Sequence, residues 1–245
     1  MRLTDWRGYD KIEFELDGKE GFVVLPKVFA EGRPWVWRAE FFEDFDQADM
    51  ALLEQGYCRA YYRQNDQYGC PQAVEGMRKF QSYVMRVFGL AEKAVIVGLS
   101  RGGLYAFNYA ATYPEQVAVM YLDAPVLDIR SWPGGKGKGI GAAREWQECL
   151  AAYGLSEETS LSAKVSPLDR IESVASAGIP IILVAGDADN VVPYLENGAL
   201  LVRRYRELGG TIVSVVKEKV GHHPHSLTDP GSIVTFIRNR SCTPS

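Results

Sequence analysis

Short apolar runs alternate with longer helical stretches along most of the chain, and this alternation restricts the possible folds more than any other feature of the sequence. The strongest of these runs lie at 93–99, 117–123, 179–185 and 211–217. The first, "KAVIVGL", is apolar almost throughout, which is typical of a strand buried on both faces of a sheet. Strands that alternate with helices form a mostly parallel sheet with helices on both faces, so the sequence predicts an α/β fold.

The N-terminal part has a different pattern, because two short strand-like runs follow each other without a helix between them. Residues 11–16 and 21–25 alternate or run apolar, and Asp17-Gly18 between them is a turn signal, so an antiparallel hairpin is predicted. The other predicted elements, in chain order, are a helix at 39–54, a strand at 57–62, and helices at about 72–88, 101–112, 194–208 and 230–240.

The segment 124–178 interrupts the alternation and is longer than an ordinary connection between a strand and a helix. It contains the glycine-rich run "GGKGKGIG" at 134–141 and a predicted helix at about 142–153. Long excursions of this kind often form lids or binding loops. We therefore expect residues 1–245 to form a single domain that carries a lid-like insert at 124–178.

Composition excludes several classes of partner. The 27 basic and 31 acidic residues give a formal net charge of −4, which provides no basic surface for nucleic acid. Residues 1–20 contain many charges, and no apolar run reaches the roughly 18 residues of a membrane helix.

The cysteines form no C-x-x-C motif; they are Cys58, Cys70, Cys149 and Cys242. We expect free thiols and a cytoplasmic protein, with Cys58–Cys70 the only pair that suggests a disulfide.

A G-x-S-x-G pattern follows the predicted strand at 93–97, where Gly98 and Gly102 flank Ser100. In a nucleophile elbow the serine lies on a sharp turn between strand and helix, and we expect a β-carbon at either glycine to clash with the nearby backbone. The helix that follows directs its N-terminal N–H groups at the serine, which favours an oxyanion there. The pattern therefore predicts Ser100 as a nucleophile, with the N–H of Arg101 as one oxyanion donor. The alternative is a glycine-rich turn that only allows close packing.

Two further strand ends carry the residues that a serine nucleophile needs. The strand 179–185 is followed by Asp187 and Asp189, and the strand 211–217 by Gly221-His222. Because the carboxyl ends of parallel strands meet at one edge of a sheet, Ser100, an aspartate and a histidine can converge there. A base and an acid that orients it are the usual means of activating a serine hydroxyl.

Three of these segments together resemble the α/β-hydrolases, and the resemblance covers essentially the whole chain. The sequences "GLSRGG" (98–103), "GDADNVVP" (186–193) and "GHHPH" (221–225) resemble the elbow, the acid loop and the histidine loop of that superfamily. The order Ser, Asp, His along the chain is the one expected of the fold. More narrowly, "RPWVWRAEFF", "SRGGLYAFNYAA" and "SWPGGKGKG" resemble a bacterial group of small hydrolases often associated with carbohydrate breakdown.

The resemblance implies which aspartate is the acid and which histidine is the base. Asp189 matches the spacing of the family's acid ahead of a Val-Pro pair, whereas Asp187 is expected to shape the turn, and Asp123 remains as a less usual acid. His222 matches the family's Gly-His and is the expected base.

The other two histidines of the loop have milder expected roles. His223 is expected to be a hydrogen-bonding or partly buried neighbour of the base, and His225 a loop residue. Their H-x-H spacing offers two metal ligands, but neither an H-E-x-x-H motif nor a third ligand at a recognisable position accompanies it, so no metal is expected. The run at 134–141 is not followed by the G-K-[S/T] of a phosphate loop, and no cofactor is expected.

One departure from the superfamily concerns the second oxyanion donor. Many α/β-hydrolases carry His-Gly after the third strand, whereas this chain has "LPKVFAEGRPWVWR", and we expect the donor within residues 27–37. Trp37 and Trp132 are expected on strand-end loops, where they would line the pocket and present a flat face to a sugar ring.

The predicted function is a serine esterase that forms an acyl-enzyme on Ser100, with His222 as base and Asp189 as its orienting acid. The insert carries polar residues suited to hydroxyl groups: Asp128, Arg130, Lys136, Lys138, Arg144 and Glu145. We therefore expect a small-molecule ester substrate, with a short acyl group such as acetyl on a sugar or another polar alcohol. The alternatives are a peptidase or lactonase that uses the same triad, or a binding protein that retains the fold without activity.

Overall fold

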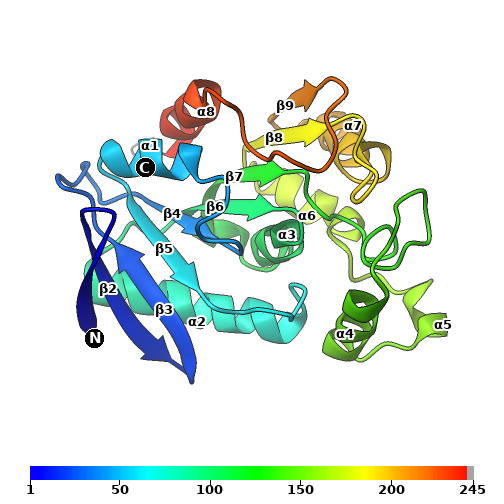
Figure 1. Cartoon of the computed structure of the whole chain (residues 1–245), viewed down its shortest axis with the longest axis horizontal. Helices are drawn as coiled ribbons and strands as arrows, with labels where there is room; N and C mark the ends of the chain where they lie inside the picture. The colour runs from blue at the N-terminus through cyan, green and yellow to red at the C-terminus, as the bar shows by residue number, and fades with distance from the viewer. Residues whose placement is uncertain (242–245) are drawn as a thin grey trace.

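A nine-stranded sheet runs through the computed structural model, which describes residues 1–241, and helices lie on both of its faces (Figure 1). The strands are β1 (Arg2–Trp6), β2 (Tyr9–Leu16), β3 (Lys19–Val24), β4 (Trp35–Arg38), β5 (Cys58–Tyr62), β6 (Ala94–Leu99), β7 (Val117–Asp123), β8 (Ile181–Gly186) and β9 (Ile212–Lys217). The helices are α1 (Gln47–Glu54), α2 (Pro71–Phe88), α3 (Gly102–Thr112), α4 (Ala143–Tyr153), α5 (Glu157–Ser160), α6 (Ile171–Ser176), α7 (Gly198–Glu207) and α8 (Gly231–Ser241).

The sheet has the order β1-β2-β3-β5-β4-β6-β7-β8-β9 and is parallel from β5 to β9. β1, β2, β3 and β5 pair antiparallel at the other side, and β2 and β3 form the predicted hairpin. Asp17 and Gly18 at its turn both have positive φ angles, 50° and 74°, as a tight hairpin turn requires. The predicted α/β-hydrolase fold, with its mostly parallel sheet and N-terminal hairpin, is confirmed.

Alternate residues of the central strands enter two separate cores. In β6, Ala94 and Ile96 pack into the larger core, which contains residues of α2, α3, α6 and α7. Val95, Val97 and Leu99 pack on the opposite face with residues of α1 and α8. Because both faces are covered, the strand is apolar along its whole length, which is the pattern that the sequence displays.

The segment between β4 and β5 differs from the prediction of a helix over 39–54. Only Gln47–Glu54 is helical, and 39–46 is a loop. Phe41 and Phe45 have positive φ angles of 55° and 48°, which an α-helix does not allow. The strands β1 and β4 are not predicted from the sequence either. β4 is only four residues long and follows Pro34, so it lacks the length by which a strand is recognised.

A buried group of charged side chains holds this loop against the sheet. The side chains of Arg38, Asp49 and Arg59 are all 0% exposed, and Asp49 forms an ion pair with each arginine. Arg59 also donates to the Phe42 carbonyl oxygen and lies 2.9 Å from Asp46. Burial lowers the pKa of Arg59. The group ties β4, β5 and α1 to the loop that follows β4.

The insert 124–178 packs against the connection between β8 and α7. The N–H of Ile140 donates to the Asn190 carbonyl oxygen at 3.0 Å, and Ser131 Oγ donates to Glu196 Oε2 at 2.8 Å. The side chain of Asn197 accepts from the Leu127 N–H at 2.9 Å. That the insert acts as a lid stays a prediction.

Cys58, Cys70 and Cys149 are buried free thiols, so Cys58 and Cys70 form no disulfide. Cys242 lies outside the described residues. Within residues 1–241, no helix combines the length and the apolar character that crossing a membrane requires.

Candidate active site

Ser100 lies between β6 and α3 with a φ angle of +48°, a left-handed conformation that a non-glycine residue rarely adopts. A β-carbon on Gly98 would lie 2.8 Å from the Gly102 carbonyl oxygen and 3.0 Å from Ala106 Cβ, so glycine is required there. The same expectation for Gly102 is wrong, because its β-carbon would meet nothing closer than 3.7 Å. The next residue, Gly103, is the second restricted position, since a β-carbon there would lie 2.7 Å from Pro125 Cβ.

The three residues predicted to converge form one hydrogen-bonded chain. Ser100 Oγ lies 2.9 Å from His222 Nε2, and His222 Nδ1 lies 2.7 Å from Asp189 Oδ2. The other oxygen of Asp189 accepts from the N–H groups of Val191 and Val192, each at 2.9 Å. These two bonds lock the carboxylate, so its second oxygen is presented to the imidazole.

The alternative acids occupy other positions. Asp187 Oδ1 accepts from the Lys219 N–H at 2.6 Å and so links the acid loop to the chain after β9. Asp123, at the end of β7, lies 2.9 Å from His225 Nδ1 and accepts from Tyr121 Oη at 2.6 Å. The structure therefore contains two carboxylate–imidazole pairs side by side, and the one that reaches Ser100 is Asp189–His222.

A cavity of about 280 Å³ opens at Ser100. Its walls come from the loop after β4, from the end of β6 with the elbow, and from the loop after β9: Phe41, Asp44, Phe45, Leu99, Ser100, His222, His223 and His225. The exposed ring of His223 stacks on Phe45 with a centroid separation of 5.7 Å. The pKa of His223 is lowered, mainly by the partial burial of its ring and to a smaller extent by the neighbouring imidazoles of His225 and His222.

Phe41, Asp44 and Phe45 are not predicted from the sequence as cavity residues, because its pattern favours a helix over 39–54. The feature of the sequence that locates these residues is the four-residue strand before them. Once Trp35–Arg38 is recognised as a parallel strand, the residues after it belong to the same sheet edge as Ser100.

The residue after Ser100 forms an ion pair with a buried carboxylate of the loop after β4. Arg101 donates to both carboxylate oxygens of Glu40, at 2.7 and 3.0 Å, and to Asp66 at 3.1 Å. Burial raises the pKa of Glu40 to about 7, although the guanidinium of Arg101 favours the charged carboxylate. The pair links the loop after β4 to the residue that directly follows Ser100.

The expectation that the second oxyanion donor lies within 27–37 is wrong. Ala30 donates its N–H to the Gly56 carbonyl oxygen just before β5, at the opposite end of the sheet from Ser100. The chain reaches the elbow only after β4, where the Ala39 N–H donates to Val97 and Phe41 lines the cavity. Within this connection, it is therefore the residues after β4, and not 27–37, that reach the sheet edge where Ser100 lies.

The expected pocket tryptophans take different positions. The expectation for Trp37 is wrong, because this side chain is 1% exposed and packs in the core against Trp35, Phe80 and Tyr109 at centroid distances of 5.0–5.5 Å. Trp132 is half-buried with its ring 6.4 Å from Tyr68, and it is not among the described residues that line the cavity.

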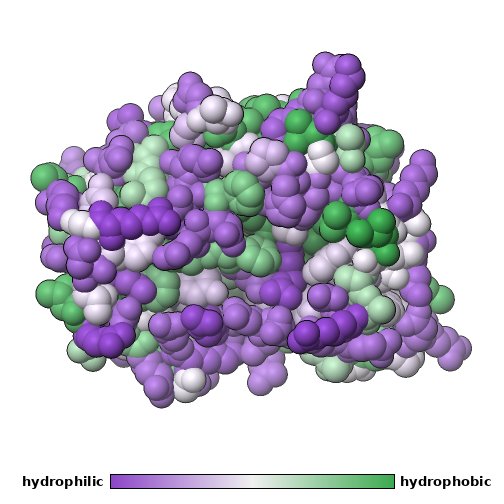
Figure 2. Space-filling view, viewed as in Figure 1, coloured by the Kyte–Doolittle hydropathy of each residue, from purple (hydrophilic) through white to green (hydrophobic). Residues whose placement is uncertain are grey.

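Most charges of the insert that were expected to meet hydroxyl groups pair within the protein. Asp128 pairs with Arg130 at 2.8 Å, Arg144 with Glu148 at 2.8 Å, and Lys136 with Glu157. The face of the molecule in Figure 2 is largely hydrophilic, with hydrophobic residues in small scattered groups. This face offers no broad apolar surface of the kind that a lipase for long chains uses.

Comparisons with known proteins agree with this fold. A family model described as the prolyl oligopeptidase family matches residues 52–238. A puromycin-hydrolyzing peptidase of Mycobacterium tuberculosis has a similar structure, with 16% identity and a TM-score of 0.74 over 96% of this chain and 40% of that chain. An acylaminoacyl peptidase of Pyrococcus horikoshii has 15% identity and a TM-score of 0.67 over 87% of this chain and 37% of that one.

A third similar structure is dipeptidyl peptidase 4 of Porphyromonas gingivalis, with 14% identity and a TM-score of 0.69 over 95% of this chain and 35% of that one. This chain thus spans between about a third and two fifths of these solved proteins. No curated protein sequence matches it. The matches support the α/β-hydrolase expectation but not the narrower grouping with carbohydrate-associated hydrolases. The chain belongs to the prolyl oligopeptidase family.

Proposed function

We propose that this protein hydrolyses the amide bond of small peptide or aminoacyl substrates through an acyl-enzyme on Ser100. The observation that carries the proposal is the continuous chain of hydrogen bonds from Ser100 Oγ through His222 to Asp189, at 2.9 and 2.7 Å. A serine at an elbow, a base within hydrogen-bond reach and an acid that orients the base are the parts that acyl transfer requires.

In the first half of the reaction, Ser100 Oγ attacks the substrate carbonyl carbon while its proton passes to His222 Nε2. The negative charge on the carbonyl oxygen is stabilised by the Arg101 N–H and by a second N–H from the residues after Ala39. The tetrahedral intermediate then breaks the carbon–nitrogen bond, and the leaving amine takes the proton from His222. Asp189 keeps the imidazole in the required tautomer and stabilises its charged form.

In the second half, water attacks the acyl-enzyme and gives a proton to His222. The new intermediate breaks the bond to Ser100 Oγ, which recovers its proton from His222, and the carboxylic acid leaves. The reaction needs only the substrate and water.

The walls of the cavity suit an amino-acid substrate better than a sugar ester. Phe41 and Phe45 offer apolar surface for a side chain, and the exposed carboxylate of Asp44 offers a partner for an amino group. The sugar-ester interpretation relied on Trp37, which is in the core, and on insert charges that pair with each other. Family membership, and solved neighbours that are themselves called peptidases, favour the amide substrate.

A substrate panel tests the proposal. It contains aminoacyl and dipeptidyl aminomethylcoumarin amides, p-nitrophenyl esters of increasing acyl length, and acetylated saccharides, each measured with the wild type and with Ser100→Ala. We expect kcat/KM to be measurable for aminoacyl amides and to depend on the side chain, and all turnover to be lost in Ser100→Ala. Short activated esters are expected to react too, because the same acyl-enzyme forms from them. Release of acetate from saccharides with no cleavage of any amide would contradict the proposal in favour of the sugar ester.

A further inference from the structure

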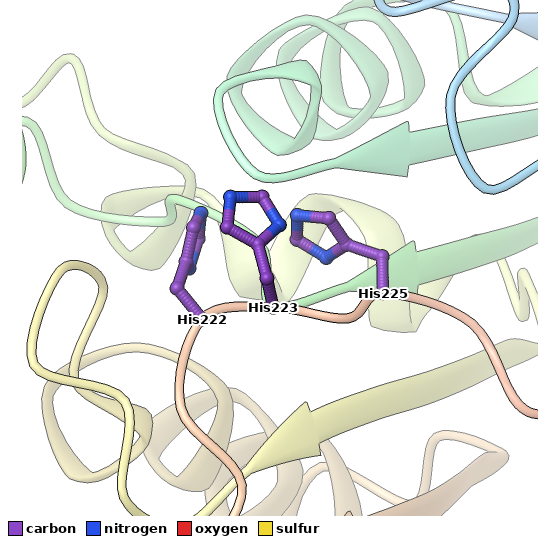
Figure 3. A group of neighbouring side chains, drawn as sticks. All are labelled: His222, His223 and His225. Atoms are coloured by element: carbon purple, nitrogen blue, oxygen red, sulfur yellow. The ribbon is translucent and has the colours of Figure 1, made fainter.

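The loop after β9 brings three imidazole rings together beside Ser100 (Figure 3). His222, His223 and His225 lie with each pair of ring centroids 4.9 Å apart and with their planes 72–86° from one another. One nitrogen from each ring lies within 4.8 Å of the others. The proposed reaction uses only His222, so the proximity of the other two rings needs a separate explanation.

Two of these rings are held in the way that metal-binding histidines are held. His222 Nδ1 lies 2.7 Å from Asp189 and His225 Nδ1 lies 2.9 Å from Asp123, and both carboxylates are almost fully buried. A carboxylate that accepts from Nδ1–H leaves Nε2 of the neutral ring with its lone pair, and it makes that nitrogen a better ligand. Asp123 is itself held by Tyr121 Oη and by the Ser226 N–H at 2.6 and 2.7 Å.

The spacing of the nitrogens is close to that of a three-histidine site. Three nitrogens that lie within 4.8 Å of one another surround a point that is at most about 2.8 Å (4.8 Å divided by √3) from each of them. Zinc–nitrogen bonds are about 2.0–2.1 Å long, so an inward movement of at most about 0.7 Å per ring brings the three nitrogens to bonding distance. His223 is exposed and can make such a movement without disturbing the core. The carboxylate of Asp44, on the wall of the same cavity, adds negative charge close to a bound cation.

We propose that His222, His223 and His225 bind a divalent transition-metal ion that prefers imidazole ligands, with zinc as the representative, and that the bound ion inhibits the enzyme. The inhibitory part rests on the proposed function. His222 Nε2 is the nitrogen that accepts the Ser100 proton, and a metal bound to the same lone pair leaves no base for the nucleophile. The ion therefore acts as a reversible inhibitor and not as a cofactor. Mg²⁺, which prefers oxygen ligands, is expected to have no effect.

Binding is tested without reference to activity, by calorimetric titration of the metal-free protein with zinc. We expect one site per chain in the wild type and in Ser100→Ala, and at least tenfold weaker binding in His223→Ala, whose exposed side chain can be removed without loss of the fold. Asp123→Asn is expected to weaken binding 10–100-fold through His225. Cys242→Ser is the control for a thiol site and should bind like the wild type. Equal zinc affinity in the wild type and His223→Ala would overturn the site.

Inhibition is tested by the rate at which a fluorophosphonate labels the protein, with and without saturating zinc, each variant compared with its own zinc-free rate. We expect zinc to slow labelling of the wild type more than tenfold, EDTA to restore the rate, and His223→Ala to lose most of this sensitivity. Unchanged labelling of the zinc-saturated wild type would overturn the inhibition. If the wild type binds zinc but is not labelled even when zinc is absent, the metal site stands. The proposed function then fails, together with the inhibition that rests on it.

Discussion

Ser100 presents its hydroxyl to His222 because the backbone turns through a left-handed conformation at this residue, with φ at +48°. A conformation of this kind costs on the order of 1–3 kcal/mol and persists only where the surroundings impose it. Here they do so through close packing on both sides, with Gly98 against α3 and Gly103 against the chain that follows β7. The elbow therefore depends on two glycines, of which only Gly98 belongs to the G-x-S-x-G motif, whereas Gly103 replaces Gly102 as the second restricted position.

This difference between the glycines is testable through stability. We expect Gly98→Ala to lower the free energy of unfolding by about 2 kcal/mol or more, because its β-carbon would overlap the Gly102 carbonyl oxygen. Gly102→Ala, at the first position of α3, should change it by less than about 1 kcal/mol. Urea unfolding of the two variants measures both values. A larger loss in Gly102→Ala than in Gly98→Ala would contradict the geometry of the elbow.

The two aspartates of the acid loop provide a matched pair of variants. Asp189→Asn should lower kcat by about ten-thousandfold, because an amide no longer orients the imidazole of His222 as a carboxylate does. Asp187→Asn leaves an acceptor for the Lys219 N–H and should keep kcat within about tenfold of the wild type. Steady-state kinetics on one aminoacyl amide compares the two. If Asp187→Asn were the more damaging change, the assignment of the acid would be wrong.

The loop after β4 is the element that decides the character of the cavity, since it provides Phe41, Asp44 and Phe45. Its position depends on the buried group of Arg38, Asp49 and Arg59. Charges with fully buried side chains persist only when each has a partner, because an uncompensated charge in the interior is expensive. The ion pairs therefore connect the core of the protein to the wall of its active site.

Removal of the central carboxylate tests this connection. Asp49→Ala leaves two buried guanidinium groups without their shared partner and should lower the free energy of unfolding by about 3–5 kcal/mol. Glu54→Ala, an exposed change at the end of the same helix, is the control and should stay within about 0.5 kcal/mol. A loss of less than 1 kcal/mol in Asp49→Ala, measured by urea unfolding, would mean that the ion pairs contribute little.

Glu40, in the same loop, gives a pH dependence whose sign is defined. Its pKa is about 7 in the folded protein against 4.5 ordinarily, so between these values the folded state keeps a proton that the unfolded state has lost. The contribution of Glu40 to stability is therefore full below pH 4.5 and is lost as the pH rises through about 7. We expect the stability of the wild type relative to Glu40→Gln to fall from pH 5 to pH 8. A constant or rising difference between their unfolding free energies would contradict the raised pKa.

The whole sheet explains why much of the site is predictable from sequence. Parallel strands end at one edge, so Ser100, Asp189 and His222 are brought together by the order of strands and helices, which leaves a clear apolar pattern. The walls of the cavity leave no such pattern. They follow a four-residue strand, and their loop is shaped by positive φ angles and buried ion pairs that depend on distant partners. The sequence predicts Trp37 on a loop for the same reason, because its strand, β4, is too short to be recognised from the apolar pattern.

The identity of the residue that a fluorophosphonate modifies tests the central claim most directly. Peptide mapping by mass spectrometry after labelling should find the phosphonate on Ser100 in the wild type and on no residue in Ser100→Ala. In His222→Ala the rate of labelling should fall by orders of magnitude, toward the roughly millionfold loss in kcat that follows removal of a triad base, whereas His223→Ala should lose far less. A phosphonate on another serine, or labelling at the normal rate in Ser100→Ala or His222→Ala, would contradict the account.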